Sequence, residues 1–263
     1  MLRTAVTAGE SAVGDAVRRL RAAGCVFAED EAAVLSGAAS DDRTLAELVD
    51  RRAHGEPLEQ VVGYADFCGV RVLLRPGVFV PRVRSELLVR LGVATAPAGA
   101  VVVDLCCGSG ALGMAVLYRR PDIDLHSADI DPVAVATARD NLHTPVHQGS
   151  LFDALPASLR GRIDVLVANV PYVATRHIPL LPAEARDHEP RSALDGGPDG
   201  LDVFRAVTAE APCWLAPGGV LLSEITEAQA GAAAEAVQAA GLDGDVVSDD
   251  DLEAQVIRGR RGR

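Results

Sequence analysis

Residues 169–172, N-V-P-Y, have the types and order needed to hold a substrate amide, and they end the apolar run IDVLVAN. An amide nitrogen is a weak nucleophile because its lone pair is delocalised into the carbonyl, so a reaction at nitrogen requires both N–H hydrogens to be held elsewhere. Asn169 offers a side-chain oxygen, and Val170 offers its carbonyl because Pro171 keeps the preceding residue extended. Tyr172 can cover the planar amide. The alternative is a strand that ends at an incidental proline.

A glycine-rich loop upstream has the spacing of a nucleotide-binding loop. Gly108, Gly110 and Gly113 in DLCCGSGALG spell G-x-G-x-x-G, and Asp129 follows after a gap of about 20 residues. Such glycines let the backbone approach a ligand, and the following helix presents its N-terminal N–H groups. The pattern fits the pyrophosphate of a dinucleotide, and it fits the carboxylate of a methionine-derived cofactor equally well.

Asp104 favours the second ligand. Its carboxylate precedes the loop, where it would repel a pyrophosphate but accept hydrogen bonds from the ammonium group of S-adenosylmethionine (SAM). Asp129 would then bind the ribose hydroxyls, and Ser150 and Leu151 the edge and face of the adenine. The alternative for Asp104 is a carboxylate that caps the next helix. We therefore expect SAM to be bound by Asp104, Cys106, Cys107, Gly108, Ser109, Gly110, Asp129, Ser150, Leu151 and Asn169.

The cysteines admit two interpretations. Cys106 and Cys107 lie beside the expected helix N-terminus, a position that lowers the pKa of a thiol and would suit a redox or nucleophilic role. The other interpretation is that they are small apolar fillers facing the cofactor. The chain has five cysteines, an odd number without C-x-x-C spacing, so we expect reduced thiols and no metal site.

These motifs require a sheet whose strands end at one edge. Apolar runs predict strands at 100–105, 123–129, 163–169 and 219–225, and helical patterns lie at 111–119, 131–142, 201–214 and 227–240. This alternation predicts an α/β fold with a Rossmann-like, doubly wound sheet of parallel strands. Ligands bind such sheets at the carboxyl ends of the strands, which is where the motifs lie.

The first 60 residues have a different pattern. AVRRLRAAG, DEAAVLSGAAS and DDRTLAELVDRRAHG predict short amphipathic helices, and VVGYADFCGVRVLLRPGVFVPR predicts a hairpin. We expect a helical substrate-recognition domain at residues 1–60, a linker hairpin at 61–82 and a SAM-binding methyltransferase domain at 83–263.

Charge and composition narrow the function classes. The net formal charge is −12, so nucleic acid is not the expected direct substrate. All 25 basic residues are arginine, which excludes lysine Schiff-base chemistry. The start lacks a signal-peptide core, and no charge-free stretch reaches the roughly 18 residues of a membrane span. We expect a cytoplasmic monomer without membrane contact, and a disordered arginine-rich tail, RGRRGR.

Several motifs occur in the order found in a known family. DLCCGSGALG, SADID, ANVPY and HEPRSALDGGPDGLDVF resemble those of the HemK/PrmC-type protein-(glutamine-N(5)) methyltransferases, and the hairpin sequence resembles the linker of that family. The resemblance covers most of the chain. It implies a helical domain on a SAM-binding domain and SAM-dependent N-methylation of a glutamine side-chain amide in a protein. A peptide chain release factor is the first candidate substrate, with Asn169, Pro171 and Tyr172 as catalytic residues.

The chain departs from the family at some positions. Val170 replaces the first proline of N-P-P-Y, Cys106 replaces the first glycine of the loop, and Val83 and Arg84 follow FVPR where proline and an acidic residue are usual. The carbonyl at position 170 is present with either side chain, so we expect the chemistry to be retained. A paralogue with another methyl acceptor stays open.

Other functions are compatible with parts of the pattern. N-x-P-Y also serves SAM-dependent methylation of exocyclic amines, so a nucleic acid or a small molecule is the main alternative acceptor. An NAD-dependent dehydrogenase would share the glycine spacing, but Asp104 and N-V-P-Y disfavour it. A catalytically silent SAM-binding module that docks a partner is the remaining alternative.

Overall fold

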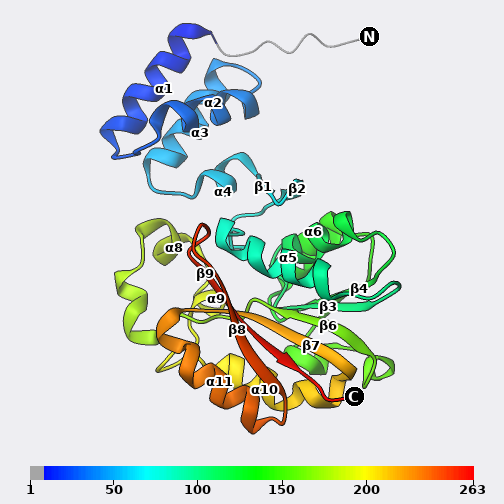
Figure 1. The fold of residues 1–263 in the computed structure, drawn as a ribbon. Helices are drawn as coiled ribbons and strands as arrows, with labels where there is room; N and C mark the ends of the chain where they lie inside the picture. The colour runs from blue at the N-terminus through cyan, green and yellow to red at the C-terminus, as the bar shows by residue number, and fades with distance from the viewer. Residues whose placement is uncertain (1–8) are drawn as a thin grey trace.

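The computed structural model describes residues 9–263 (Figure 1). The first eight residues of the expected 1–60 domain, and most of the start that lacks a signal-peptide core, lie outside the described residues. Four helices form a bundle near the N-terminus: α1 (Glu10–Ala22), α2 (Ala28–Ala38), α3 (Asp42–Ala53) and α4 (Leu58–Val62). Their apolar faces meet around Leu20, Leu35 and Leu45. Asp41 caps α3 by accepting a hydrogen bond from the Thr44 N–H at 2.7 Å.

An antiparallel hairpin of β1 (Tyr64–Phe67) and β2 (Val70–Leu73) follows the bundle. Three of its side chains, Phe67, Val70 and Val72, are buried in the same apolar cluster as the helices on one face of the main sheet. The hairpin is therefore packed onto the α/β part of the molecule.

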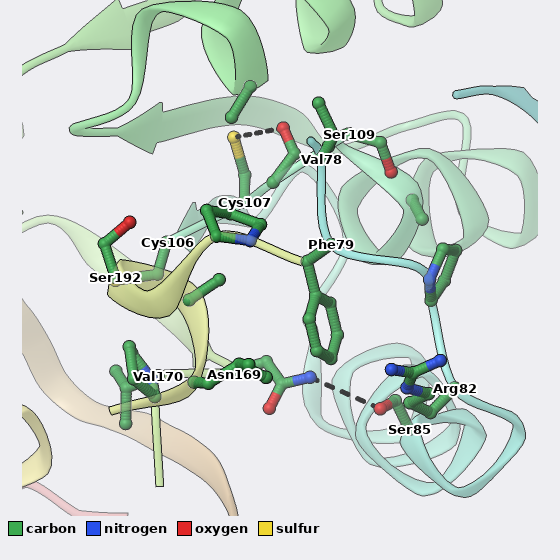
Figure 2. A pocket seen from close by; sticks show the side chains of 18 of the residues that line it. Val78, Phe79, Arg82, Ser85, Cys106, Cys107, Ser109, Asn169, Val170 and Ser192 are labelled. Carbon is green, nitrogen blue, oxygen red and sulfur yellow. Dashed lines mark hydrogen bonds between the residues drawn. The ribbon is translucent and has the colours of Figure 1, made fainter. Parts of the chain in front are cut away.

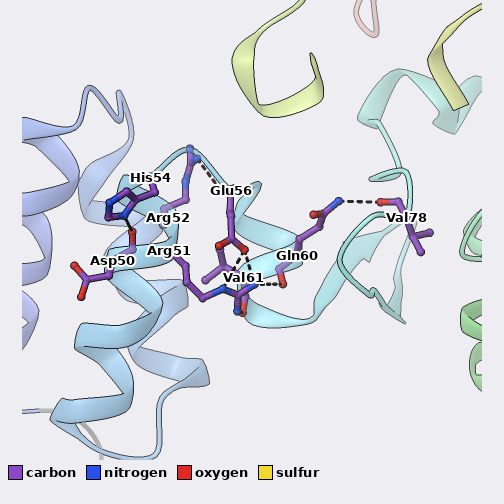
Figure 3. Close-up of polar contacts among 8 residues, drawn as sticks. All are labelled: Asp50, Arg51, Arg52, His54, Glu56, Gln60, Val61 and Val78. Carbon is purple, nitrogen blue, oxygen red and sulfur yellow. Dashed lines mark hydrogen bonds and ion pairs between the residues drawn. The ribbon is translucent and has the colours of Figure 1, made fainter. Parts of the chain in front are cut away.

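Polar contacts join the bundle to the α/β part. The buried Gln60 donates from Nε2 to the Val78 carbonyl at 3.0 Å (Figure 3). The largely buried Arg52 of α3 pairs with Glu31 of α2 at 2.6 Å and with Glu184, far along the chain, at 2.7 Å. These contacts fix the bundle beside the segment that contains Glu184.

The main sheet has seven strands in the order β5-β4-β3-β6-β7-β9-β8. Their bounds are β3 (Val101–Leu105), β4 (Asp124–Asp129), β5 (Val146–Gln148), β6 (Ile163–Ala168), β7 (Leu215–Ile225), β8 (Asp243–Asp249) and β9 (Ala254–Arg260). The five strands from β3 to β7 are parallel. The predicted α/β, Rossmann-like fold is confirmed.

The end of the chain differs from the expectation of parallel strands and a disordered tail. β9 pairs antiparallel with both β7 and β8. The last two strands therefore form a hairpin in which β9 lies next to β7 and β8 is at the edge of the sheet. Arg258 and Arg260 of RGRRGR belong to β9. The arginines misled the prediction because the sequence does not reveal that Arg258 pairs with Asp245 on the neighbouring strand at 2.7 Å.

Helices cover both faces of the sheet (Figure 1). One face packs against α5 (Glu86–Thr95), α6 (Ala111–Arg119) and α7 (Pro132–Asn141), and the other against α10 (Asp202–Trp214) and α11 (Ala230–Ala239). Both faces are covered, which is why VVVDL and IDVLVA are almost continuously apolar. Shorter elements are η1 (Val83–Ser85), η2 (Leu151–Ala154), η3 (Ala157–Leu159), η4 (Thr175–Leu180), α8 (Ala183–His188), α9 (Arg191–Leu194) and η5 (Glu227–Gln229).

The strand order reverses between β3 and β6, because the chain passes from β3 to β4 on one side and later returns to β6 on the other. Asp104, Asp129, Asn169 and Glu224 lie at or just beyond the carboxyl ends of β3, β4, β6 and β7. These strands are neighbours, so the four polar side chains meet at the switch point, where open α/β sheets bind ligands.

Candidate active site

A cavity of about 380 Å³ opens at this edge of the sheet (Figure 2). That volume is in the range of small-molecule and cofactor sites. The predicted site residues that line it are Cys106, Cys107, Gly108, Ser109, Asp129, Asn169, Val170, Pro171 and Tyr172. The predicted residues that do not line it are Asp104, Gly110, Ser150 and Leu151.

The glycine loop bends sharply over the end of β3. Cys106, Gly108 and Gly110 all have positive φ, at 58°, 55° and 79°. Gly110 also lies close to α7, since a Cβ there would come within 2.8 Å of Leu142. The backbone can make this turn and pack on α7 because position 110 has no side chain.

Asp104 is buried beneath the loop. Its Oδ2 accepts a hydrogen bond from the Gly113 N–H in α6 at 2.9 Å, as in the helix-capping alternative. Its Oδ1 is buried and has no partner among residues 9–263. Burial, with the nearby charge of Asp129, raises the pKa of Asp104 to about 7. An unpartnered carboxylate oxygen with this pKa is suited to accept from a cation that enters the site.

Asp129 ends β4 on the cavity wall. Its two oxygens accept hydrogen bonds from the Gly108 N–H at 2.8 Å and the Asp131 N–H at 2.9 Å. A carboxylate has about four lone-pair sites, so both oxygens can still accept from a ligand. Burial raises the pKa of Asp129. The backbone contacts hold the carboxylate in place at the cavity.

The tetrapeptide begins where β6 ends. Asn169 donates from Nδ2 to the Ser85 hydroxyl at 3.3 Å (Figure 2). Val170 is buried, and among residues 9–263 neither its N–H nor its carbonyl has a hydrogen-bond partner. Its carbonyl is therefore free to accept. The Tyr172 ring lines the cavity while its hydroxyl donates to Glu224 at 2.7 Å.

Comparison with known proteins adds the evidence of descent. A family model described as "Methyltransferase small domain" matches residues 69–185. A "Release factor glutamine methyltransferase" of Moorella thermoacetica is 36% identical over 254 residues, covering 88% of this chain and 89% of that protein. That of Streptomyces coelicolor is 35% identical, covering 83% and 85%. The match to that of Geobacter sulfurreducens is 38% identical but spans 65% of that protein's length.

The chain belongs to the release factor glutamine methyltransferase family. The resemblance noted in the sequence is confirmed, and the protein is an enzyme of the methyltransferase class.

Solved structures support the fold. A methyltransferase from Pyrococcus furiosus superposes with a TM-score of 0.56 at 14% identity, covering 83% of this chain and all of that chain. A 16S rRNA N2 G1207 methyltransferase from T. thermophilus, in complex with AdoMet and guanosine, gives 0.52 at 17% identity, covering 75% and 49%. At these identities the likeness concerns the fold alone.

Ser150 and Leu151 lie away from the cavity wall, in the turn that enters η2. Leu151 has a φ of 47° and packs against the apolar cluster on the α10–α11 face of the sheet. Ile130, which follows Asp129, does line the cavity and is 60% exposed. The sequence signal for this position is an apolar residue directly after the acidic end of a strand.

Burial decides between the interpretations of the two loop cysteines. Desolvation, with the charges of Asp104 and Asp129, raises the pKa of both Cys106 and Cys107. A raised pKa favours the neutral thiol over the thiolate that a nucleophilic or redox role requires. The position beside a helix N-terminus is outweighed by burial, and packing against the cofactor is the interpretation that these pKa directions favour.

We expect Cys106→Gly to be more stable than Cys106→Ala by about 1 kcal/mol, because φ is 58° here and glycine alone adopts it without steric strain. Both variants lose the sulfur, so their difference isolates the backbone. In an ordinary helical position the order would be reversed. Urea denaturation of both variants measures the difference in free energy of unfolding, and equal or reversed stabilities would contradict a strained loop.

The structure adds residues that the sequence analysis missed. Arg84, Ser85 and Glu224 form a polar group behind the tetrapeptide. The buried Glu189 accepts from Arg82, a residue of the cavity lining, at 2.5 Å, and this contact joins the segment before η1 to the segment after β6. The sequence does contain a signal for Glu224, which is a lone carboxylate near the end of the apolar strand GVLLSEI. Asp104 has the same position in its own strand.

Within residues 9–263, no three His, Cys, Asp or Glu side chains are grouped as a metal site. In the same range, no helix combines the length and apolar character that crossing a bilayer requires.

Proposed function

We propose that this protein uses SAM in the cytoplasm to methylate the side-chain amide nitrogen of a glutamine in a protein, and that the protein is a peptide chain release factor. The observation that carries the proposal is that Asn169 and Val170 lie beside the glycine loop in one cavity, and that the Val170 carbonyl has no hydrogen-bond partner within the described residues 9–263. Family membership supports the same activity, because the relatives are named for release factor glutamine methylation.

The residues present fit SAM on three counts. The buried Oδ1 of Asp104 has no hydrogen-bond partner among residues 9–263 and suits the ammonium group. Asp129 lies on the cavity wall and suits the ribose hydroxyls. Cys106, Gly108 and Ser109 line the cavity with a sharply bent backbone that leaves room for the amino-acid end. When bound, SAM supplies an electrophilic methyl group on its sulfonium centre.

The chain's own residues would prepare the glutamine amide. The Asn169 oxygen and the Val170 carbonyl would each accept one N–H hydrogen, which leaves the nitrogen lone pair directed at the methyl group. Tyr172 would cover the flat face of the amide, its ring fixed by the hydroxyl contact to Glu224. Catalysis of this kind rests mainly on proximity and orientation. No general base is required, since the methylated nitrogen loses its proton readily.

We expect SAM affinity to rise about fivefold from pH 6 to pH 7, because only the ionised form of Asp104, with a pKa of about 7, pairs with an ammonium group. The affinity should fall again above about pH 8, as the α-amino group of the ligand loses its proton. Calorimetric titration with SAM across this range measures the profile. Asp104→Asn should bind more weakly and without the rise between pH 6 and pH 7. A parent protein with the same flat profile would contradict the pairing.

The N-terminal helices are proposed to bind the protein substrate. None of the described residues 9–66 lines the cavity, so the bundle does not contribute to that wall. The Arg52–Glu184 pair places the bundle next to the cavity, because Glu184 also lies on the cavity lining. A monomer suffices for this arrangement, since the residues proposed for both functions lie in one chain.

The decisive experiment is incubation of a purified release factor with the enzyme and SAM carrying a labelled methyl group, followed by peptide mass spectrometry. The expected result is one added methyl group on a glutamine. Label on nucleic acid instead of protein would favour the exocyclic-amine alternative, which the net charge of −12 disfavours.

A further inference from the structure

A buried carboxylate receives three hydrogen bonds behind the cavity wall. Glu224 is 3% exposed and lies near the end of β7, beside the end of β6. Its Oε1 accepts from Arg84 Nε at 2.8 Å and from the Tyr172 hydroxyl at 2.7 Å. Its Oε2 accepts from the Ser85 hydroxyl at 2.6 Å. An ionised carboxylate can only accept, so each of these three groups must donate its hydrogen to Glu224.

The Ser85 hydroxyl in turn determines which end of the Asn169 amide faces it. A hydroxyl has a single hydrogen, and Ser85 directs it to Glu224. Toward Asn169 the Ser85 oxygen can therefore only accept, and the group that it meets at 3.3 Å is the Asn169 NH₂. A terminal amide has two orientations of similar shape, and its hydrogen-bond partners decide between them.

We propose that Glu224, acting through Ser85, is a positioning residue that holds the Asn169 amide with its oxygen available to the substrate. The inference rests on the proposed function, because it matters only if Asn169 accepts a substrate N–H. The opposite orientation would present an NH₂ group to the N–H of the glutamine amide. Two donors would then face each other, and Asn169 would offer the substrate hydrogen no acceptor.

Glu224→Gln tests this relay by replacing one carboxylate oxygen with an NH₂ group. Arg84 and Tyr172 both donate to the Oε1 position, so the glutamine oxygen is held there and its NH₂ faces Ser85. Ser85 then accepts from the glutamine, and its own hydrogen loses its acceptor in a buried position. That hydrogen regains an acceptor when the Asn169 amide turns its oxygen toward Ser85, so the opposite orientation of Asn169 is favoured. The reverse placement of the glutamine would put its NH₂ against two donors, one of them a cation.

The expected result is a drop in kcat of about 10²-fold or more, since one oriented transition-state contact is lost. SAM affinity should stay close to that of the parent, because Glu224 does not line the cavity. The melting temperature should fall, because Arg84 loses its ionic partner, so kcat is compared at a temperature where both proteins are folded. The double variant Glu224→Gln with Ser85→Ala should recover at least about tenfold in kcat over the single variant, because removing the hydroxyl removes the forced reorientation. A merely structural role predicts that the double variant is worse.

The matched control is Glu227→Gln, which changes an exposed carboxylate on η5, shortly after the strand. It should leave kcat unchanged.

Single-turnover methylation of the release factor at saturating SAM measures all four proteins. A folded Glu224→Gln variant within about threefold of the parent would overturn the relay, and so would a double variant no better than the single one. If Glu224→Gln does not fold, the comparison of Ser85→Thr with Ser85→Ala tests the relay, because only threonine keeps the hydroxyl. Equal kcat for these two variants would overturn the proposal.

An Asn169→Ala variant with full activity would contradict the proposed function itself. Loss in Asn169→Ala without loss in Glu224→Gln rejects the relay alone.

Discussion

Asn169→Ala is expected to lower methyl transfer by about 10²–10³-fold, the usual effect of removing an oriented hydrogen-bond partner from the transition state. The side chain contacts Ser85 at 3.3 Å and lines the cavity, so its removal deletes an acceptor without opening the core. Single-turnover transfer at saturating SAM separates this loss from weaker cofactor binding. A variant that folds and retains the parent rate would make the tetrapeptide an ordinary strand terminus.

Two companion variants sharpen the result. Asn169→Asp keeps an acceptor but brings a carboxylate against the Ser85 oxygen, whose hydrogen is already donated to Glu224, so it should also be impaired. Val170→Pro restores the tetrapeptide of the family. The Val170 N–H has no partner among residues 9–263, so proline removes no hydrogen bond there. We expect Val170→Pro to stay within a few-fold of the parent rate. A folded but inactive Val170→Pro would assign a role to the valine side chain.

Asp129→Ala is expected to weaken SAM binding by about 10- to 150-fold, corresponding to roughly 1.5–3 kcal/mol for hydrogen bonds to a charged group. The variant loses acceptors for the ribose hydroxyls and also frees the Gly108 N–H that shapes the loop. Calorimetry with SAM measures the change.

A matched control for this variant lies on the same strand. Asp124→Ala removes a carboxylate from the opposite, exposed end of β4 and should leave SAM affinity unchanged. Unchanged affinity in Asp129→Ala would place the ribose elsewhere, and equal weakening in both variants would point to loss of the strand rather than of a contact.

Much of the candidate site could be predicted from the sequence because one rule applies at every parallel strand. A polar residue that ends an apolar run lies at the shared edge of the sheet, and this rule selects Asp104, Asp129 and Asn169 from the sequence alone. Glu224 obeys the same rule but was not selected, because no motif adjoined it. Ser85 could not be found in this way, since its contact with Asn169 joins residues 84 positions apart and depends on how η1 packs.

Other features depended on competition between local and tertiary effects. The loop position of Cys106 and Cys107 predicts a lowered thiol pKa, yet burial reverses the direction. Ser150 and Leu151 follow the right strand, but the turn into η2 carries them off the cavity wall. Sequence spacing fixes the order of residues along the chain, whereas the depth and direction of each side chain are set by what packs against it.

The position of β9 has a consequence for how the protein is made. The ribosome synthesises the chain from the N-terminus, so β8 emerges before β9, the strand that joins it to the sheet. Until β9 is in place, β7 has an open edge and β8 has no neighbouring strand, because β9 lies between them. An unpaired strand edge is a template for pairing with another chain. The insertion of β9 therefore both completes the sheet and closes the edge of β7 to association with other chains.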